Sequence, residues 1–287
     1  MITPTVNNVI AKKSDPKSIT SQQYADQAIA SHHLIMANAK VIDDYHKMNL
    51  GGRIGITLNL IPTIPKDSTN ANDVLAAKRF DGMHNRWFLD ASIKGVYPQD
   101  ILDLYKTYNV DVKSFEIPKL QNSKPDFLGV NFYAPAVVSW DEKFPMSANW
   151  MTNNPDSVKM FNGYVRPDYL YKLLMRIKNE YSNIPTIITE NGAGFGDADE
   201  QVVDGKVNDK LRCAYLQTHI AAALQAKQDG ADLQGYFLWS ILDNFEWMSG
   251  YDKRFGIVYV NFDTQERIPK QSFYLYQKII SENKIMQ

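Results

Sequence analysis

Carboxylate and aromatic side chains lie at the ends of short apolar segments of the sequence. Glu190 directly follows the apolar segment 184–189, and Trp239 lies near the end of the segment 235–240, with Glu246 shortly after it. Tryptophan faces bury the apolar side of a sugar ring, and carboxylates accept paired hydrogen bonds from neighbouring hydroxyl groups. These residue types indicate a site for a neutral polyhydroxylated ligand.

The segments that carry these side chains alternate with helix-like stretches. Continuously apolar segments predict four buried strands at 53–60, 127–133, 184–189 and 235–240, with a short extra strand at 256–262. Helical spacing of apolar residues predicts helices at 21–47, 73–89, 169–181, 211–228 and 272–285, and residues 140–166 are expected to form a long loop. This alternation is typical of an α/β fold with a parallel sheet, whose functional side chains gather at the carboxyl ends of the strands.

The composition excludes several classes of protein. The 287 residues include 31 Lys and Arg against 32 Asp and Glu, and 44% are hydrophobic, as in an ordinary globular protein. A net charge of −1 argues against nucleic acid or an anionic membrane as the main partner. The longest apolar runs have the length of a strand, so no membrane span is predicted.

The chain has one cysteine, Cys213, which excludes an internal disulfide bond and a cysteine-cluster metal site. The five histidines show no metal-ligand spacing, so we expect neither a metal nor another cofactor. The first twenty residues contain no apolar core of the secretory kind, which predicts a cytoplasmic protein.

Two long motifs resemble glycoside hydrolase family 1, the β-glucosidase family. They are TIITENG at 186–192 and GYFLWSILDNFEWMSGYDKRFGIVYVNF at 235–262. Weaker matches occur upstream in family order, among them RIGI at 53–56 and GVNFY at 129–133. The resemblance covers nearly the whole chain, and it implies the (β/α)8 TIM-barrel fold and retaining hydrolysis of β-glycosides in carbohydrate metabolism.

The resemblance also assigns roles to individual residues. Glu190 matches the nucleophile, and Tyr133 matches the tyrosine that hydrogen-bonds and holds it. The matches to the family's sugar-binding positions are Asn131, Trp239, Glu246, Trp247 and Phe255. Tyr164 stands where the family usually has a tryptophan on the aglycone side, which implies altered aglycone contacts.

Glu246 bears on the kind of sugar. Family members that act on 6-phosphorylated sugars replace this glutamate with a small residue, because a carboxylate would repel a phosphate dianion. The intact DNFEW sequence at 243–247 therefore favours a non-phosphorylated sugar, with gluco, galacto and fuco configurations open.

A retaining glycosidase needs a second carboxyl group about 5–5.5 Å from the nucleophile, which acts first as acid and then as base. The family supplies it from an Asn-Glu-Pro sequence at the end of strand four, and no Asn-Glu-Pro occurs here. The one Asn-Glu pair, Asn179-Glu180, falls in the predicted helix 169–181 and is interpreted as solvent-exposed. The four strands therefore correspond to barrel strands five to eight, with residues 1–10 as a candidate relic strand.

The sequence thus predicts a single domain over residues 1–287 that resembles the C-terminal half of the family barrel. It carries the nucleophile but lacks the acid/base motif, so the chain alone is expected to be inactive or weak. The alternative is a non-catalytic sugar-binding or scaffold protein derived from the family, and the sequence leaves both readings open. Because an open half-barrel exposes strand edges, we expect it to associate with itself or with a missing N-terminal half.

Overall fold

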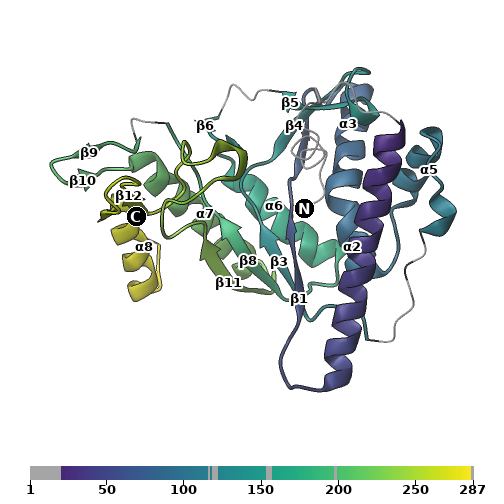
Figure 1. Ribbon diagram of the computed structural model, residues 1–287, viewed down its shortest axis with the longest axis horizontal. Coiled ribbons are helices and arrows are strands. Elements are labelled where there is room, and N and C mark those ends of the chain that lie inside the picture. Colours follow the sequence, from purple (N-terminus) through teal and green to yellow (C-terminus); the bar gives the residue numbers. More distant parts are fainter. Residues whose placement is uncertain (1–20, 116, 118–121, 153–156, 197–198, 286–287) are drawn as a thin grey trace. The chain divides into compact units, whose positions relative to one another are not determined.

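The computed structural model describes residues 21–115, 117, 122–152, 157–196 and 199–285 (Figure 1). The chain groups into two compact units, the first made of Met1–Gly129 with Ala136–Asn153, the second of Val130–Pro135 with Asn154–Gln287. The candidate relic strand at 1–10 lies outside the described residues, and the single domain over 1–287 stays a prediction. Among the helices of the described residues, none has the length and apolarity needed to cross a membrane.

The first unit combines a long helix with a small mixed sheet. Its helices are α2 (Ser21–Met48), α3 (Ala71–Asp81), α4 (Trp87–Leu89) and α5 (Gln99–Thr107), with π-helical turns at Gly82–Arg86 and Asp90–Lys94 and 3-10 turns at Val112–Ser114 and Pro145–Ser147. Its strands are β1 (Gly55–Asn59), β2 (Thr63–Pro65), β4 (Ala136–Trp140) and β5 (Ala148–Thr152). Strands β2, β4 and β5 form a three-stranded sheet on which α3 packs.

An aromatic cluster forms the core of the first unit. Trp87 is buried and its indole Nε1 donates a hydrogen bond to Ser31 Oγ at 2.9 Å. The Trp87 ring stacks on Tyr97, with ring centres 4.1 Å apart. Buried His32 places Nδ1 2.8 Å from the Tyr97 hydroxyl, so both polar groups are satisfied inside the core.

The prediction of a long loop at 140–166 is wrong in part. Strand β5 pairs antiparallel with β4, and the short strands β6 (Lys159–Met160) and β7 (Gly163–Tyr164) form a hairpin. Strands of two to five residues carry too few side chains to show an alternating pattern. Whether they form is determined by the strands with which they pair. Helix α5 was not predicted, although its buried Ile101 and Tyr105 lie one helical turn apart.

Helix α2 is held near its end by contacts of His46 with Asp126 and Asn122. His46 Nε2 lies 3.0 Å from Asp126 Oδ2, and His46 Nδ1 lies 2.7 Å from the carbonyl oxygen of Asn122. The hydrogen bond to Asp126, followed by that to Asn122, raises the pKa of His46 above its ordinary 6.5. Protonated His46 is therefore favoured in the folded chain.

We expect the thermal stability of the chain to fall as pH rises from 6 towards 9, because the stabilisation by protonated His46 is complete below an unfolded pKa of about 6.5 and is lost as pH passes the higher folded value. Melting temperatures of the His46→Gln variant should depend less on pH over this range. His33→Gln, at an exposed histidine, is the control. Equal pH dependence in all three chains would show that the pair does not contribute.

The second unit contains the remaining elements. Its helices are α6 (Pro167–Glu180), α7 (Lys210–Gln228) and α8 (Gln271–Glu282), with a 3-10 turn at Trp247–Ser249. Its strands are β6, β7, β8 (Thr186–Asn191), β9 (Val202–Val203), β10 (Lys206–Val207), β11 (Leu233–Leu238), β12 (Val258–Val260) and β13 (Arg267–Pro269). Helices α6 and α7 pack on each other, and α7 contacts both α8 and β11.

The four predicted barrel strands all form, and the sheet order is β1-β3-β8-β11. Strand β3 (Phe127–Asn131) begins in the first unit and ends in the second. Strands β8 and β11 run parallel, with Ile188 opposite Tyr236 and Asn191 opposite Leu238. Parallel neighbours bring their carboxyl ends to one edge, so the residues that follow β8 and β11 lie at the same end of the sheet.

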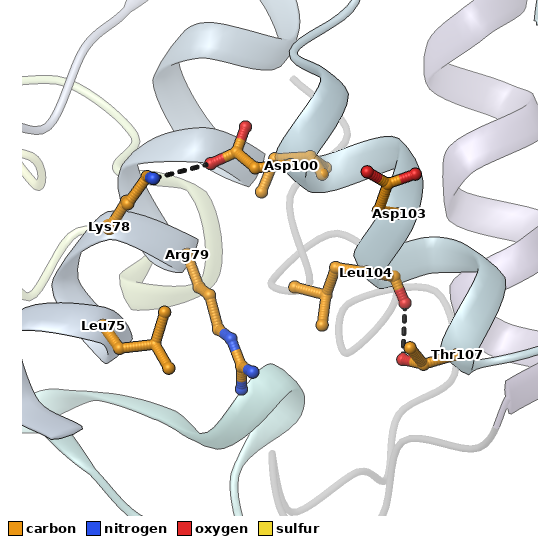
Figure 2. A pocket seen from close by; sticks show the side chains of 8 residues that line it. Leu75, Lys78, Arg79, Asp100, Asp103, Leu104 and Thr107 are labelled. Atoms are coloured by element: carbon orange, nitrogen blue, oxygen red, sulfur yellow. Dashed lines mark hydrogen bonds and ion pairs between the residues drawn. The ribbon is translucent and has the colours of Figure 1, made fainter.

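A pocket of about 290 Å³ lies in the first unit, lined by residues of α3 and α5. Figure 2 shows two contacts among its lining residues, the Lys78–Asp100 ion pair at 3.8 Å and the hydrogen bond from the Thr107 hydroxyl to the carbonyl oxygen of Leu104 at 2.6 Å. None of the eight lining residues is aromatic, and none is a predicted site residue. The pocket therefore does not correspond to the sugar site predicted from the sequence.

Candidate active site

Glu190 and Tyr133 form the centre of the candidate site. Glu190 lies in β8, one residue before its end, and Tyr133 lies two residues beyond β3. The Tyr133 hydroxyl donates a hydrogen bond to Glu190 Oε2 at 2.5 Å, while the backbone N–H of Phe132 donates to the Glu190 carbonyl at 2.9 Å. Burial, then the hydrogen bond to Glu190, raises the pKa of Tyr133, so the phenol stays protonated and keeps donating.

A buried hydrogen-bond network holds Tyr133 and Glu190 in place. Asn191 is fully buried, and its Nδ2 donates to the carbonyl oxygen of Phe132 at 2.7 Å and to the Tyr215 hydroxyl at 2.8 Å. Tyr215 donates in turn to the carbonyl oxygen of Tyr133 at 3.0 Å, and Tyr236 donates to Asn191 Oδ1 at 2.6 Å. The network fixes the end of β3 against β8, which orients Tyr133 towards the carboxylate.

Sequence reasoning did not find these supporting residues. Asn191 belongs to the TENG motif, which marks its position, but the sequence alone indicates no role for its side chain. Tyr215 lies inside α7, where an aromatic residue looks like ordinary core, and only the fold reveals its hydroxyl contacts.

Asn131 is also buried near the ends of the strands, as expected for a residue lining the site. Its Oδ1 accepts a hydrogen bond from Thr189 Oγ1 at 2.6 Å. This contact joins β3 to β8 one residue before Glu190, and it fixes which way the Asn131 amide points.

Phe255 forms an aromatic wall beside the pair. Its ring centre lies 6.0 Å from that of Tyr133, edge to face, and 6.0 Å from that of Phe161. The Phe161 N–H donates to the Gly194 carbonyl at 2.8 Å, which holds the β6–β7 hairpin to the segment after Glu190. Tyr164, the predicted aglycone-side residue, is half-buried in the same hairpin.

Trp239 and Glu246 extend the site beyond the end of β11. The Trp239 N–H donates to the Asn191 carbonyl at 3.1 Å, and the Glu246 carboxylate accepts a hydrogen bond from the Trp239 side chain. Burial, then the nearby Glu190 charge, raises the pKa of Glu246. Trp247 differs from these residues because 82% of its surface is exposed. The structure thus gathers most of the predicted residues, with Trp247 at the surface.

A buried ion network anchors the loops that carry these side chains. The Arg212 guanidinium, fully buried, bonds Asp209 at 2.7 Å and pairs closely with Glu200. It also donates to the carbonyl oxygens of Ala193 at 3.1 Å and Arg254 at 3.0 Å. Arg212 therefore links the segment after Glu190 to the segment before Phe255.

Lys270 completes the network from the start of α8. Its ammonium group is fully buried and bonds Glu200 and, at 3.1 Å, Asp243. Asp243 accepts from Arg254 at 2.7 Å and from the Gly256 N–H at 3.0 Å, on either side of Phe255. Burial raises the pKa of Glu200 and lowers that of Lys270, so their charges depend on the partners around them.

Replacing Lys270 with methionine should destabilise the chain by about 3–5 kcal/mol, because buried carboxylates then lose a cation. Urea unfolding measures the difference. The control is Lys278→Met, at an exposed lysine 3.7 Å from Glu282, with an expected change below about 0.5 kcal/mol. A loss for Lys270→Met no larger than the control's would mean that the network does not hold the fold together.

Neither a metal-binding cluster nor a second site carboxylate is found at the Asn-Glu pair. Within the described part of the chain, no group of three or more His, Cys, Asp or Glu side chains could hold a metal ion. The side chain of Glu180 is about half exposed and accepts a hydrogen bond from Arg176 at 3.0 Å, which confirms that the lone Asn-Glu pair is a helix-surface feature.

The pattern that defines glycosyl hydrolase family 1 matches residues 12–285 of the sequence. The chain belongs to glycosyl hydrolase family 1. Beta-glucosidase A of Enterobacter agglomerans is 40% identical over 269 residues, covering 92% of this chain and 56% of the relative. A 6-phospho-beta-galactosidase of Leptotrichia buccalis is 33% identical, covering 90% of this chain and 61% of the relative.

Solved family 1 structures agree with the fold. The family 1 β-glucosidase from Thermotoga maritima matches with a TM-score of 0.84 and 34% identity, over 92% of this chain and 58% of its own. The β-glucosidase from Exiguobacterium antarcticum B7 matches with a TM-score of 0.80 and 39% identity, over 88% and 56%. This family 1 chain is therefore a partial α/β barrel that spans a little over half the length of these relatives.

Proposed function

We propose that the second unit is the nucleophile half of a retaining β-glycosidase site. The observation that carries the proposal is the 2.5 Å hydrogen bond from Tyr133 to the Glu190 carboxylate at the end of β8. A carboxylate that accepts a hydrogen bond from a phenol is held in one orientation for attack. Its place at the carboxyl ends of parallel strands is where barrel enzymes gather their reacting groups.

In the proposed first step, a Glu190 carboxylate oxygen attacks the anomeric carbon of a β-glycoside. The new carbon–oxygen ester bond forms as the bond to the aglycone oxygen breaks, and the leaving oxygen takes the electron pair. A poor leaving group needs a proton from an acid at that moment, whereas a nitrophenolate leaves as an anion. The chain is therefore expected to react with activated glycosides and to be weak or inactive on ordinary ones.

The sugar is proposed to lie on Trp239 and to be bound by Glu246 and Trp247. Glu190 lies close enough to Glu246 for its charge to raise the pKa of Glu246. A phosphate dianion at this place would meet two carboxylates, so a non-phosphorylated sugar is favoured. Glucose-like inhibitors with and without a 6-phosphate can be compared for how well each slows covalent labelling of Glu190. This comparison tests the preference for a non-phosphorylated sugar.

The acid/base carboxyl group is proposed to come from the part of the family barrel that this sequence does not match. No Asn-Glu-Pro occurs in the sequence, and Glu180 lies on a helix surface. A β/α segment corresponding to the unmatched part of the relatives would supply it. The supplied carboxyl group would have to lie about 5–5.5 Å from Glu190.

A 2,4-dinitrophenyl 2-deoxy-2-fluoro-β-glucoside tests the proposed function. Its leaving group needs no acid, and the fluorine slows hydrolysis of the glycosyl-enzyme. The expected result is a burst of dinitrophenolate approaching one equivalent per folded chain. A folded chain that releases no burst, but binds glucose-like inhibitors, would instead support a non-catalytic sugar-binding role.

That second function has its own supporting observation. Trp239 and Glu246 contact each other and lie beside the site whether or not an acid is present. A binding or scaffold protein needs only these contacts, so it tolerates loss of the acid. The burst experiment separates it from the enzyme, since binding alone leaves the reagent intact.

A further inference from the structure

Tyr133 lies beyond the end of its strand, so the pairing of β3 with its neighbours does not by itself fix the Tyr133 backbone. Strand β3 ends at Asn131, two residues earlier. The carbonyl oxygen of Phe132 accepts a hydrogen bond from Asn191 Nδ2 at 2.7 Å. The carbonyl oxygen of Tyr133 accepts one from the Tyr215 hydroxyl at 3.0 Å. The direction of the Tyr133 phenol therefore depends on two side chains outside β3.

The Tyr215 hydroxyl joins the two halves of the Tyr133–Glu190 pair. It accepts a hydrogen bond from Asn191 Nδ2 at 2.8 Å and donates its one proton to the Tyr133 carbonyl oxygen. Asn191 directly follows Glu190, and the Tyr133 phenol bonds Glu190 Oε2. One hydroxyl group of α7 thus connects the backbone that carries the carboxylate to the backbone that carries its hydrogen-bond donor.

Tyr215 is itself held in a fixed position. It is 1% exposed, and its ring stacks on that of His219, one helical turn later in α7, with ring centres 3.7 Å apart. His219 Nδ1 lies 2.9 Å from the Tyr215 carbonyl oxygen, which can only accept, so Nδ1 carries the proton and the imidazole has one orientation. Burial lowers the pKa of His219 to about 4, so the stacked ring is neutral near pH 7.

Apolar packing brings the segment after β3 to the same helix. Ala134 is buried in a cluster that includes Tyr215 and Leu216 of α7 together with Ala193. Apolar contacts have no direction, so they hold this segment against α7 without orienting the peptide group of Tyr133. The directional contact between α7 and Tyr133 is the hydrogen bond from the Tyr215 hydroxyl.

We propose that Tyr215 is a positioning residue for the nucleophile and that it acts from helix α7 through Tyr133. Its hydroxyl keeps the Tyr133 phenol directed at Glu190. Because Tyr215 is buried, it contacts no sugar, so loss of the hydroxyl should slow attack by Glu190 and leave sugar affinity unchanged. The inference rests on the proposed function and goes further by assigning part of the reactivity of Glu190 to a residue of α7.

A double-mutant cycle between Tyr215→Phe and Tyr133→Phe tests the proposal in the full chain, with the 2,4-dinitrophenyl fluoro-glucoside as reagent. Tyr215→Phe keeps the stacked ring and removes only the hydroxyl. We expect the labelling rate constant at saturating reagent to fall by about 3- to 10-fold, with the half-saturating concentration unchanged. In the Tyr133→Phe background the fall should be less than about twofold, because no phenol remains to be positioned.

Tyr105→Phe is the matched control, since it removes another buried tyrosine hydroxyl, in the first unit, and should change neither constant. Thermal unfolding of each variant identifies a temperature at which all are folded. Three outcomes would overturn the proposal: no slowing by Tyr215→Phe, equal slowing in both backgrounds, and a rise in the half-saturating concentration that accounts for the slowing.

His219→Leu is the second variant if Tyr215→Phe does not fold. It keeps the Tyr215 hydroxyl but removes the ring stacked on it, and among the described residues His219 Nε2 has no partner to lose. This variant should slow labelling only where the Tyr133 phenol is present. No slowing, or slowing in both backgrounds, would overturn the proposal.

A second measurement needs no reaction. The carbon-13 chemical shift of the Glu190 carboxyl group, assigned by its loss in Glu190→Gln, responds to the hydrogen bond from Tyr133. Tyr215→Phe should move this shift in the same direction as Tyr133→Phe, and an unmoved shift would overturn the proposal. A chain that shows the movement but is not labelled would refute the proposed function only. Labelling that Tyr215→Phe does not affect would refute the positioning role only.

Discussion

Replacing Glu190 with glutamine is expected to abolish covalent capture of the activated fluoro-glucoside, with a loss of at least about 10³-fold in labelling rate. The amide has nearly the same shape as the carboxylate but cannot attack the anomeric carbon. It can still accept the hydrogen bond that Tyr133 donates at 2.5 Å, so the fold around it should persist. Labelling rates from intact-mass spectrometry measure the effect.

Tyr133→Phe supplies the graded comparison. Removing a hydrogen bond to a charged group costs about 1.5–3 kcal/mol, so labelling should slow by roughly 10- to 100-fold rather than stop. Tyr251→Phe is the matched control, at an exposed tyrosine in the same unit. If the Glu190→Gln variant is labelled at the wild-type rate, another group is the nucleophile.

Gly192→Ala is expected to destabilise the chain by about 3 kcal/mol or more, since overpacking against backbone atoms cannot be relieved by a rotamer change. A Cβ at Gly192 would lie 1.8 Å from the Trp239 carbonyl oxygen. Either the segment after Glu190 or the end of β11 must shift, and both carry site residues. The activated fluoro-glucoside should therefore also label this variant more slowly than wild type, at a temperature where both chains are folded.

Gly196→Ala is the matched control for this substitution. Gly196 belongs to the same glycine-containing loop, but a Cβ there meets nothing within 4 Å. Its effect should stay within about 0.5 kcal/mol, as for an ordinary surface substitution. Thermal or urea unfolding measures the loss of stability in both variants. Similar losses of stability would show that Gly192 has no special packing role.

Much of the fold and the site could be predicted because the relevant signals are local. The four barrel strands are short apolar runs, and TENG and FLWS mark where two of them end. Glu190 and Tyr133 are far apart in the sequence, and the family resemblance was needed to pair them. Their 2.5 Å contact agrees with that pairing, while their catalytic roles remain proposals.

The rest could not be predicted because it depends on partners distant in the chain. Strand β5 exists because it pairs with β4, and its own residues carry no clear period. Lys270 and Arg212 read as surface charges in a sequence, yet both are fully buried in a network of carboxylates. Buried charges are stabilised by opposite charges that lie far away in the sequence, so the local sequence does not reveal their burial.

This chain is proposed to hold a competent nucleophile in Glu190, without the Asn-Glu-Pro acid/base motif. The most direct test is peptide mapping of the wild-type chain after incubation with the 2,4-dinitrophenyl fluoro-glucoside and with its methyl counterpart. We expect one adduct, on Glu190, with the activated reagent and none with the methyl glycoside. A folded chain without an adduct on Glu190, or one labelled equally fast by both reagents, would contradict it.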